Sequence, residues 1–297
     1  MHFDIITYMR NKRLIILLSV FGGIVVLVIV MSAVFTIYHI EALCVSHYSP
    51  TQNEEISEVS GQVIEAADDF MYRSIFLFDE EELMEAVDSK VIRAETVNVE
   101  CVFPNKIQID YRYVSDDLQI YNEDDGTYII AGTSCKITRI SEEPVVSSDS
   151  PVMTVTPFEK PVSNVPGEYL YSVDSFDRIA MAMLTTYAES LEKPSDAGSK
   201  VFRASYDSVD LSRGGGDPSV GGGIIEITMR SGFTFRLECR SDGSFEEGGD
   251  LERAVNAMVS SYYAASNSDA VDETGGYAVV HYDRNTGSYR ADYGTDS

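Results

Sequence analysis

The sequence predicts an α+β protein with a single N-terminal transmembrane helix, a small domain in the order strand, helix, helix, strand, strand, and a larger β-rich domain with flanking helices. Three observations lead to this prediction. An uncharged apolar run covers residues 14–38. Across residues 51–113, apolar side chains recur first every three or four positions and then every second position, which are the periods of a helix and a strand. Alternation returns in residues 224–239 and 277–293.

The apolar run has the properties of a membrane anchor. At about 1.5 Å per residue, a helix of this length exceeds the roughly 30 Å hydrocarbon core of a bilayer. Arg10, Lys12 and Arg13 precede the run, so the positive-inside rule predicts a cytoplasmic tail at residues 1–13 and an extracytoplasmic bulk. A cleaved signal peptide is the alternative, but its apolar stretch would be only about 7 to 15 residues long and would end at an A-x-A-like site, which we do not find here.

Composition excludes one class of function. The chain has 22 Lys and Arg against 48 Asp and Glu, a formal net charge of -26 at pH 7. A nucleic-acid binder needs clustered cations for phosphate contacts. We therefore expect no nucleic-acid partner.

The elements expected in the first extracytoplasmic domain, residues 39–113, follow in order. An apolar strand begins the domain, and Thr51 and Glu54 have the spacing of a capping box ahead of an amphipathic helix that extends to Phe70. A second, short helix begins after Asp79 with three glutamates in its first turn. Two alternating runs joined at Pro104-Asn105 then form a hairpin with one buried face. The expected core consists of Ile56, Val59, Val63, Phe76, Val97, Val99, Ile107 and Ile109.

This order directly after an anchor resembles the POTRA module of the bacterial cell-division proteins FtsQ and DivIB. The local similarity lies in three segments: Arg73-Ser74-Ile75-Phe76-Leu77-Phe78-Asp79, Ile92-Arg93-Ala94-Glu95-Thr96-Val97 and Val102-Phe103-Pro104-Asn105-Lys106-Ile107-Gln108-Ile109. The last is the most specific, because these proteins typically carry an aromatic-Pro turn between two strands. The resemblance implies a POTRA-like domain at residues 39–113.

The second domain, residues 114–297, begins with a region that contains a proline-rich segment at 144–166, where no regular helix can form. This segment is either a disordered linker or an extended chain laid along a sheet. After it we expect a helix capped by Ser175, a hairpin turning at Ser231-Gly232, a helix beginning at Asp250, and two terminal strands. This order is similar to the second, β-rich domain of FtsQ and DivIB proteins.

The sequence offers few candidate catalytic or ligand-binding residues. The four histidines are scattered, so a nucleophilic site would rest on His281 without a recognisable elbow. Gly214-Gly215-Gly216 and Gly221-Gly222-Gly223 predict a flexible loop between strands rather than a phosphate loop. The four cysteines form no CxxC pair, and for Cys101 and Cys239 we expect buried free thiols. We expect no catalytic residue, no metal site and no cofactor.

The resemblance implies a non-enzymatic scaffold of the division septum that binds single-pass division proteins of the FtsB/DivIC and FtsL types and regulates septal peptidoglycan synthesis. The alternative is a membrane-anchored wall-active enzyme or ligand-sensing module. The candidate partner-binding residues are four tyrosines of the terminal strands, because tyrosine is favoured at interfaces and a terminal strand is often a sheet edge. They are Tyr277, Tyr282, Tyr289 and Tyr293.

Overall fold

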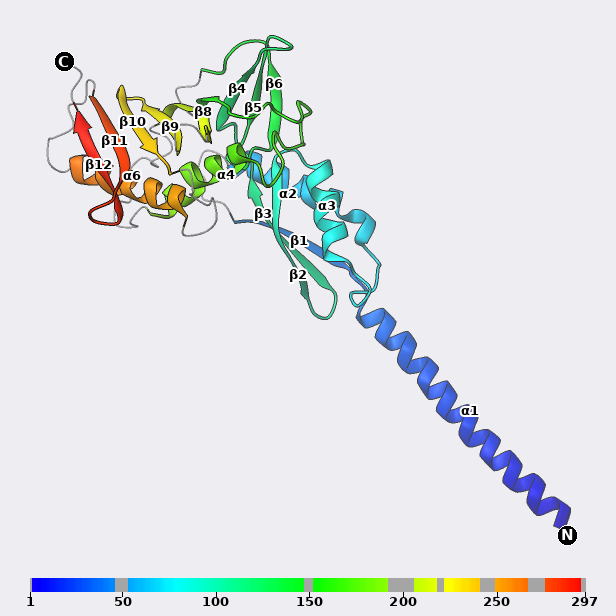
Figure 1. Cartoon of the computed structure of the whole chain (residues 1–297). Helices are drawn as coiled ribbons and strands as arrows, with labels where there is room; N and C mark the ends of the chain where they lie inside the picture. Colours follow the sequence, from blue (N-terminus) through cyan, green and yellow to red (C-terminus); the bar gives the residue numbers. More distant parts are fainter. Residues whose placement is uncertain are drawn as a thin grey trace. The chain divides into compact units, whose positions relative to one another are not determined.

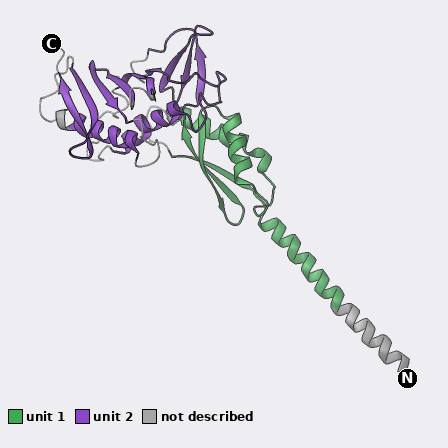
Figure 2. Ribbon diagram, in the orientation of Figure 1, with its two compact units in different colours: residues 1–113 green, residues 114–297 purple. Residues whose placement is uncertain are grey.

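The computed structural model describes residues 2–45, 53–146, 152–191, 206–217, 222–240, 249–266 and 276–294. The chain forms two compact units, residues 1–113 and 114–297 (Figure 2). Helices and a large β-sheet occur together, so the predicted α+β class is confirmed.

The first element is the long helix α1 (His2–Val34). Its segment Leu17–Val34 is apolar enough to cross a membrane and is not buried against the described part of the chain. A single apolar helix of this kind is compatible with a membrane anchor.

The rest of unit 1 is a three-stranded sheet covered by two helices. Strand β1 (His39–Cys44) is followed by α2 (Asn53–Ala66), the short 3₁₀ helix η2 (Asp68–Phe70), α3 (Glu80–Lys90), β2 (Ala94–Val102) and β3 (Lys106–Tyr113) (Figure 1). The sheet order is β1-β3-β2, with β1 parallel and β2 antiparallel to β3. Asp79 caps α3 as expected, because its carboxylate accepts hydrogen bonds from the N–H groups of Glu81 (3.1 Å) and Glu82 (3.3 Å). The expected cap of α2 at Thr51 lies outside the described residues.

Six of the eight expected core residues of unit 1 are buried, and two are not. Val97 is 44% exposed because a β-bulge between Thr96 and Asn98 interrupts the side-chain alternation of β2. Phe76 is 61% exposed because it lies in the turn before α3 rather than on the sheet, and its ring packs on Phe35 and Phe103. The predictions for these two residues are therefore wrong.

Unit 2 contains a nine-stranded sheet. Its strands are β4 (Leu118–Asn122), β5 (Thr127–Ala131), β6 (Ile137–Ser141), β7 (Met153–Thr156), β8 (Tyr206–Asp217), β9 (Gly222–Met229), β10 (Phe233–Glu238), β11 (Gly276–Asp283) and β12 (Ser288–Gly294). The order across the sheet is β12-β11-β10-β9-β8-β7-β4-β5-β6. Strand β7 pairs in parallel with both β4 and β8, so this part of the proline-rich segment takes the second of the two predicted alternatives.

The helices of unit 2 pack on one face of this sheet. They are α4 (Phe176–Ala182), the π-helical stretch η3 (Met183–Tyr187), α5 (Ala188–Ser190) and α6 (Asp250–Ser266). Ser175 caps α4, since its hydroxyl accepts a hydrogen bond from the N–H of Arg178 (3.3 Å). Leu184, Val255 and Met258 join the inward side chains of the strands in one buried cluster. This core supports α6 against β10, β11 and β12 (Figure 1).

The two glycine-rich runs, expected to form a loop, lie partly in strands. Gly214, Gly215 and Gly216 lie within β8, and Gly222 and Gly223 begin β9. A Cβ at Gly223 would collide with the carbonyl oxygen of Gly214, so glycine is required where these two strands approach.

Candidate partner-binding site

The four candidate tyrosines lie on β11 and β12, at one end of the sheet of unit 2. Strand β12 is the terminal strand in the sheet order, and among the described residues only β11 pairs with it (Figure 1). An edge strand presents backbone N–H and C=O groups to which another chain can add a strand. Whether the four tyrosines bind a partner stays a prediction.

Tyr282 and Tyr289 form the inward part of this pair of strands. They are directly opposite in the antiparallel register, and their rings meet edge to face with centroids 5.5 Å apart. Tyr289 is buried, and burial raises its pKa above the ordinary value of tyrosine. These two side chains therefore hold β12 against the core rather than offering contact area.

The side chain of Arg240 contacts both β11 and the start of α6. Its guanidinium lies over the ring of Tyr282, 4.0 Å from the centroid, and its Nε is 2.8 Å from the Asp250 carboxylate at the start of α6. The side chain of Asp250 is 5% exposed and that of Arg240 is 40% exposed, so the carboxylate is shielded from water while part of the arginine side chain is not. Alternation predicts Arg240 on the outer face of the sheet, but Arg240 lies beyond the end of β10 at Glu238, and its side chain bonds to Asp250 at the start of α6.

Tyr277 and Tyr293 differ from the inward pair because they are 40% and 49% exposed. The hydroxyl of Tyr293 donates a hydrogen bond to the carbonyl oxygen of Ser261 on α6 (2.8 Å). The ring of Tyr277 lies across Gly294, where any side chain would collide with it. The two rings are thus fixed in position while much of their surface stays in contact with water.

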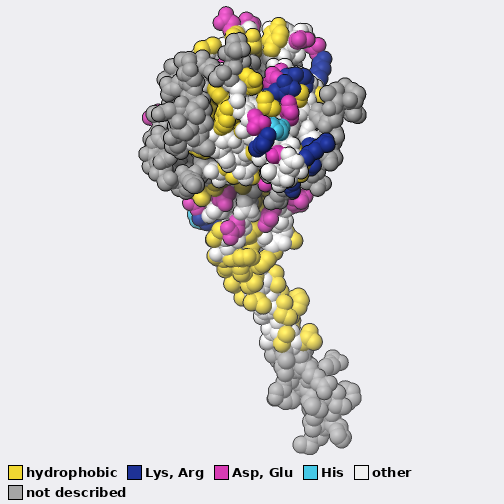
Figure 3. Space-filling model, turned by 60° about the vertical axis from the view of Figure 1, so that its left-hand side comes forward, with side chains coloured by type: hydrophobic (Ala, Val, Ile, Leu, Met, Phe, Trp, Pro, Cys, Tyr) yellow, Lys and Arg dark blue, Asp and Glu magenta, His cyan; other side chains and the backbone are white. Residues whose placement is uncertain are grey.

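The outer face of β11 and β12 carries charges of both signs (Figure 3). Arg290 lies 3.3 Å from the carboxylates of both Asp283 and Asp292, and His281 lies 3.6 Å from Asp292. The N–H of Asn285, and next the charge of Arg290, hold the pKa of Asp283 below its usual range. Alternating charge of this kind keeps an exposed edge soluble and favours a partner with complementary charges.

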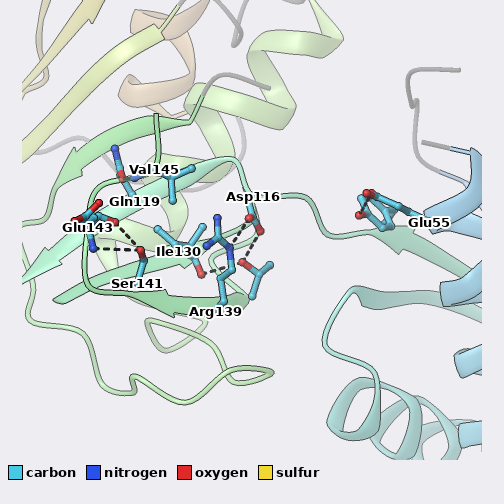
Figure 4. Close-up of polar contacts among 10 residues, drawn as sticks. Glu55, Asp116, Gln119, Ile130, Arg139, Ser141, Glu143 and Val145 are labelled. Atoms are coloured by element: carbon cyan, nitrogen blue, oxygen red, sulfur yellow. Dashed lines mark hydrogen bonds and ion pairs between the residues drawn. The ribbon is translucent and has the colours of Figure 1, made fainter. Parts of the chain in front are cut away.

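The opposite edge of the sheet is β6, and its neighbourhood contains several local polar contacts. Arg139 forms an ion pair with Asp116 (2.8 Å), and the hydroxyl of Ser141 donates to the carbonyl oxygen of Glu143 (2.6 Å) (Figure 4). The N–H of Val145 donates to the side-chain oxygen of Gln119 on β4 (2.8 Å), so the chain after β6 folds back over the sheet (Figure 4). The β6 edge carries no exposed tyrosine comparable to Tyr293.

Burial explains two perturbed pKa values elsewhere in unit 2. Burial raises the pKa of Asp177, whose carboxylate accepts hydrogen bonds from the N–H groups of Phe158 (2.8 Å) and Glu159 (2.7 Å). Burial raises the pKa of the Cys239 thiol to about 12, so it stays protonated and weakly nucleophilic at neutral pH. Within the described ranges, no group of three or more His, Cys, Asp or Glu side chains could hold a metal ion.

Sequence reasoning missed the residues that hold β11 and β12 against α6. Arg240, Asp250 and Ser261 belong to segments far from β12 in sequence, and only the fold brings them together. The aromatic content of the last strands was the available signal for the site. Neither a protein-family model nor a curated protein matches this chain.

Proposed function

We propose that this chain is a membrane-anchored, non-enzymatic scaffold of the FtsQ/DivIB type, with its bulk outside the cytoplasm at the division septum. In this proposal it binds single-pass division proteins of the FtsB/DivIC and FtsL types and thereby regulates septal peptidoglycan synthesis.

The anchor and unit 1 support the proposal through their order. An apolar helix is followed directly by a strand, two helices and a hairpin, which is the order on which the resemblance to the POTRA module rests. The aromatic-Pro turn lies where the resemblance requires it, between β2 and β3, and the Phe103-Pro104 peptide bond is cis.

The observation that carries the proposal is the β12 edge. A scaffold acts by presenting a surface, and this edge combines the terminal strand β12, the half-exposed Tyr277 of β11 and Tyr293 of β12, and the helix α6, which fixes the ring of Tyr293. An extended segment of a partner can add to this edge as a further strand and contact the ring of Tyr293. Asp177 is engaged in backbone hydrogen bonds and the Cys239 thiol is buried in the core, which favours the scaffold over a wall-active enzyme that would use these groups.

Imaging of a fluorescent fusion tests this proposal. We expect the full chain, labelled at its N-terminus, to form a band at the division site during constriction. The matched control is the anchor alone, residues 1–38 with the same label, which should spread evenly over the membrane because it lacks both units. An even distribution of the full chain through the cell cycle would reject the septal role.

A further inference from the structure

Unit 1 carries a group of exposed apolar side chains where the chain leaves α1. We define the apolar collar as these exposed side chains together with the partly buried Phe35, on which two of their rings pack; its members are Phe35, Tyr38, Tyr72, Phe76, Leu77 and Phe103. Four of them are at least 60% exposed: Tyr72, Phe76, Leu77 and Phe103. Hydrophobic side chains continue without a break from α1 onto the adjoining part of unit 1 (Figure 3).

Ring packing joins the five aromatic side chains of the collar into two groups. The centroid of Phe35 lies 4.9 Å from that of Phe76 and 6.2 Å from that of Phe103, and Phe76 and Phe103 are 5.8 Å apart. Tyr38 and Tyr72 form a second edge-to-face pair at 5.9 Å. These rings come from three segments: the end of α1, the turn before α3, and the β2–β3 turn.

Backbone hydrogen bonds hold these three segments next to one another. The N–H of Ile75 donates to the carbonyl oxygen of Phe35 (2.9 Å), and the N–H of Ile37 donates to that of Arg73 (2.9 Å). The N–H of Tyr38 donates to the carbonyl oxygen of Asn105 in the β2–β3 turn (2.9 Å). The turns therefore lie beside the point at which the chain leaves α1.

The length of α1 sets the depth at which these three segments lie in a bilayer. The 18 residues Leu17–Val34 span about 27 Å at 1.5 Å per residue, close to the hydrocarbon thickness of about 30 Å. With Arg13 in one headgroup region, the hydrocarbon ends near Val34, and Phe35 enters the opposite headgroup region. Aromatic side chains are enriched at this depth of membrane proteins.

We propose that the apolar collar inserts into the headgroup region of the lipid bilayer and so holds unit 1 against the membrane surface. The proposal rests on α1 as a membrane anchor and is independent of the division role. Contact is apolar rather than electrostatic, because the two neighbouring basic residues are in ion pairs, Arg73 with Glu82 at 3.1 Å and Lys106 with Glu41. Insertion therefore needs no anionic lipid and is expected in zwitterionic bilayers.

The absence of tryptophan from the sequence gives a direct test. The full chain is reconstituted in vesicles as single-tryptophan variants Phe76→Trp and Phe103→Trp, and lipids brominated near the headgroup end of the acyl chain serve as quenchers. The matched control is Leu43→Trp, which is 50% exposed on β1 but eight positions beyond Phe35 along an extended chain. At about 3.3 Å per residue, Leu43 lies well outside the lipid.

We expect blue-shifted emission and roughly twofold or greater quenching for both collar variants, and neither effect for Leu43→Trp, in zwitterionic bilayers. Quenching equal to that of the control would overturn the proposal. Blue-shifted emission without quenching would also overturn it, since it would show that a protein surface rather than lipid covers the collar. Failure of the chain to float with the vesicles would instead reject the anchor itself.

Discussion

Replacing Tyr293 with alanine is expected to weaken the binding of an FtsB/DivIC-type partner about 30-fold, the effect of removing an interface residue worth about 2 kcal/mol. The ring is 49% exposed and is held in place by the hydrogen bond to Ser261, so it offers a large area with little entropy left to lose. Affinity for the extracytoplasmic segment of the partner, measured by calorimetry with the full chain in detergent, checks this expectation.

Two control variants make that result specific. Tyr293→Phe keeps the ring but loses the hydrogen bond to Ser261, so its affinity should lie between those of the original chain and Tyr293→Ala. Tyr121→Ala removes a tyrosine of nearly equal exposure, 50%, from β4, an interior strand toward the opposite end of the same sheet, and should leave binding unchanged. Equal losses for Tyr293→Ala and Tyr121→Ala, or an unchanged affinity of a folded Tyr293→Ala, would move the interface away from β12.

Replacing Ile109 with alanine should destabilise unit 1 by about 2–5 kcal/mol, because it removes a fully buried side chain and leaves a cavity. Ile109 is 0% exposed on β3, the central strand of its sheet. Since the chain has two units and a single melting temperature would mix them, hydrogen exchange of the β2 and β3 amides in the full chain is the suitable measurement.

Phe76→Ala serves as the comparison for Ile109→Ala. Its ring is 61% exposed and makes two aromatic contacts, so we expect a cost of only about 1–2 kcal/mol from lost ring packing. A cost for Phe76→Ala equal to that for Ile109→Ala would show that the collar is part of the core of unit 1.

The sequence predicts where the strands of this fold lie better than it predicts which strands are neighbours in a sheet. Period-2 alternation identifies β9, β10 and β3 because each has one buried face. Alternation does not say which strands pair, so it cannot predict that β7 lies between β4 and β8. Alternation wrongly places Val97 in the core, because a β-bulge turns a side chain to the other face of the sheet and the residue types alone do not reveal the bulge.

The candidate site was predictable in its aromatic composition and not in its geometry. Counting tyrosines cannot distinguish the inward Tyr282 and Tyr289 from the exposed Tyr277 and Tyr293. That distinction depends on the register of β11 and β12 and on α6, which is remote in sequence. Phe76 shows the same limit in unit 1, since an apolar residue next to a membrane anchor has a second environment besides the core.

Hydrogen exchange at β12 with and without the partner tests the central claim most directly. The full chain in a membrane mimetic is compared alone and with the extracytoplasmic segment of an FtsB/DivIC-type protein. Strand addition supplies backbone partners to the edge, so exchange should slow at Ser288–Gly294 and stay unchanged at β6. Unchanged exchange at β12 in a saturated complex, or slowing at the β6 edge instead, would contradict the account.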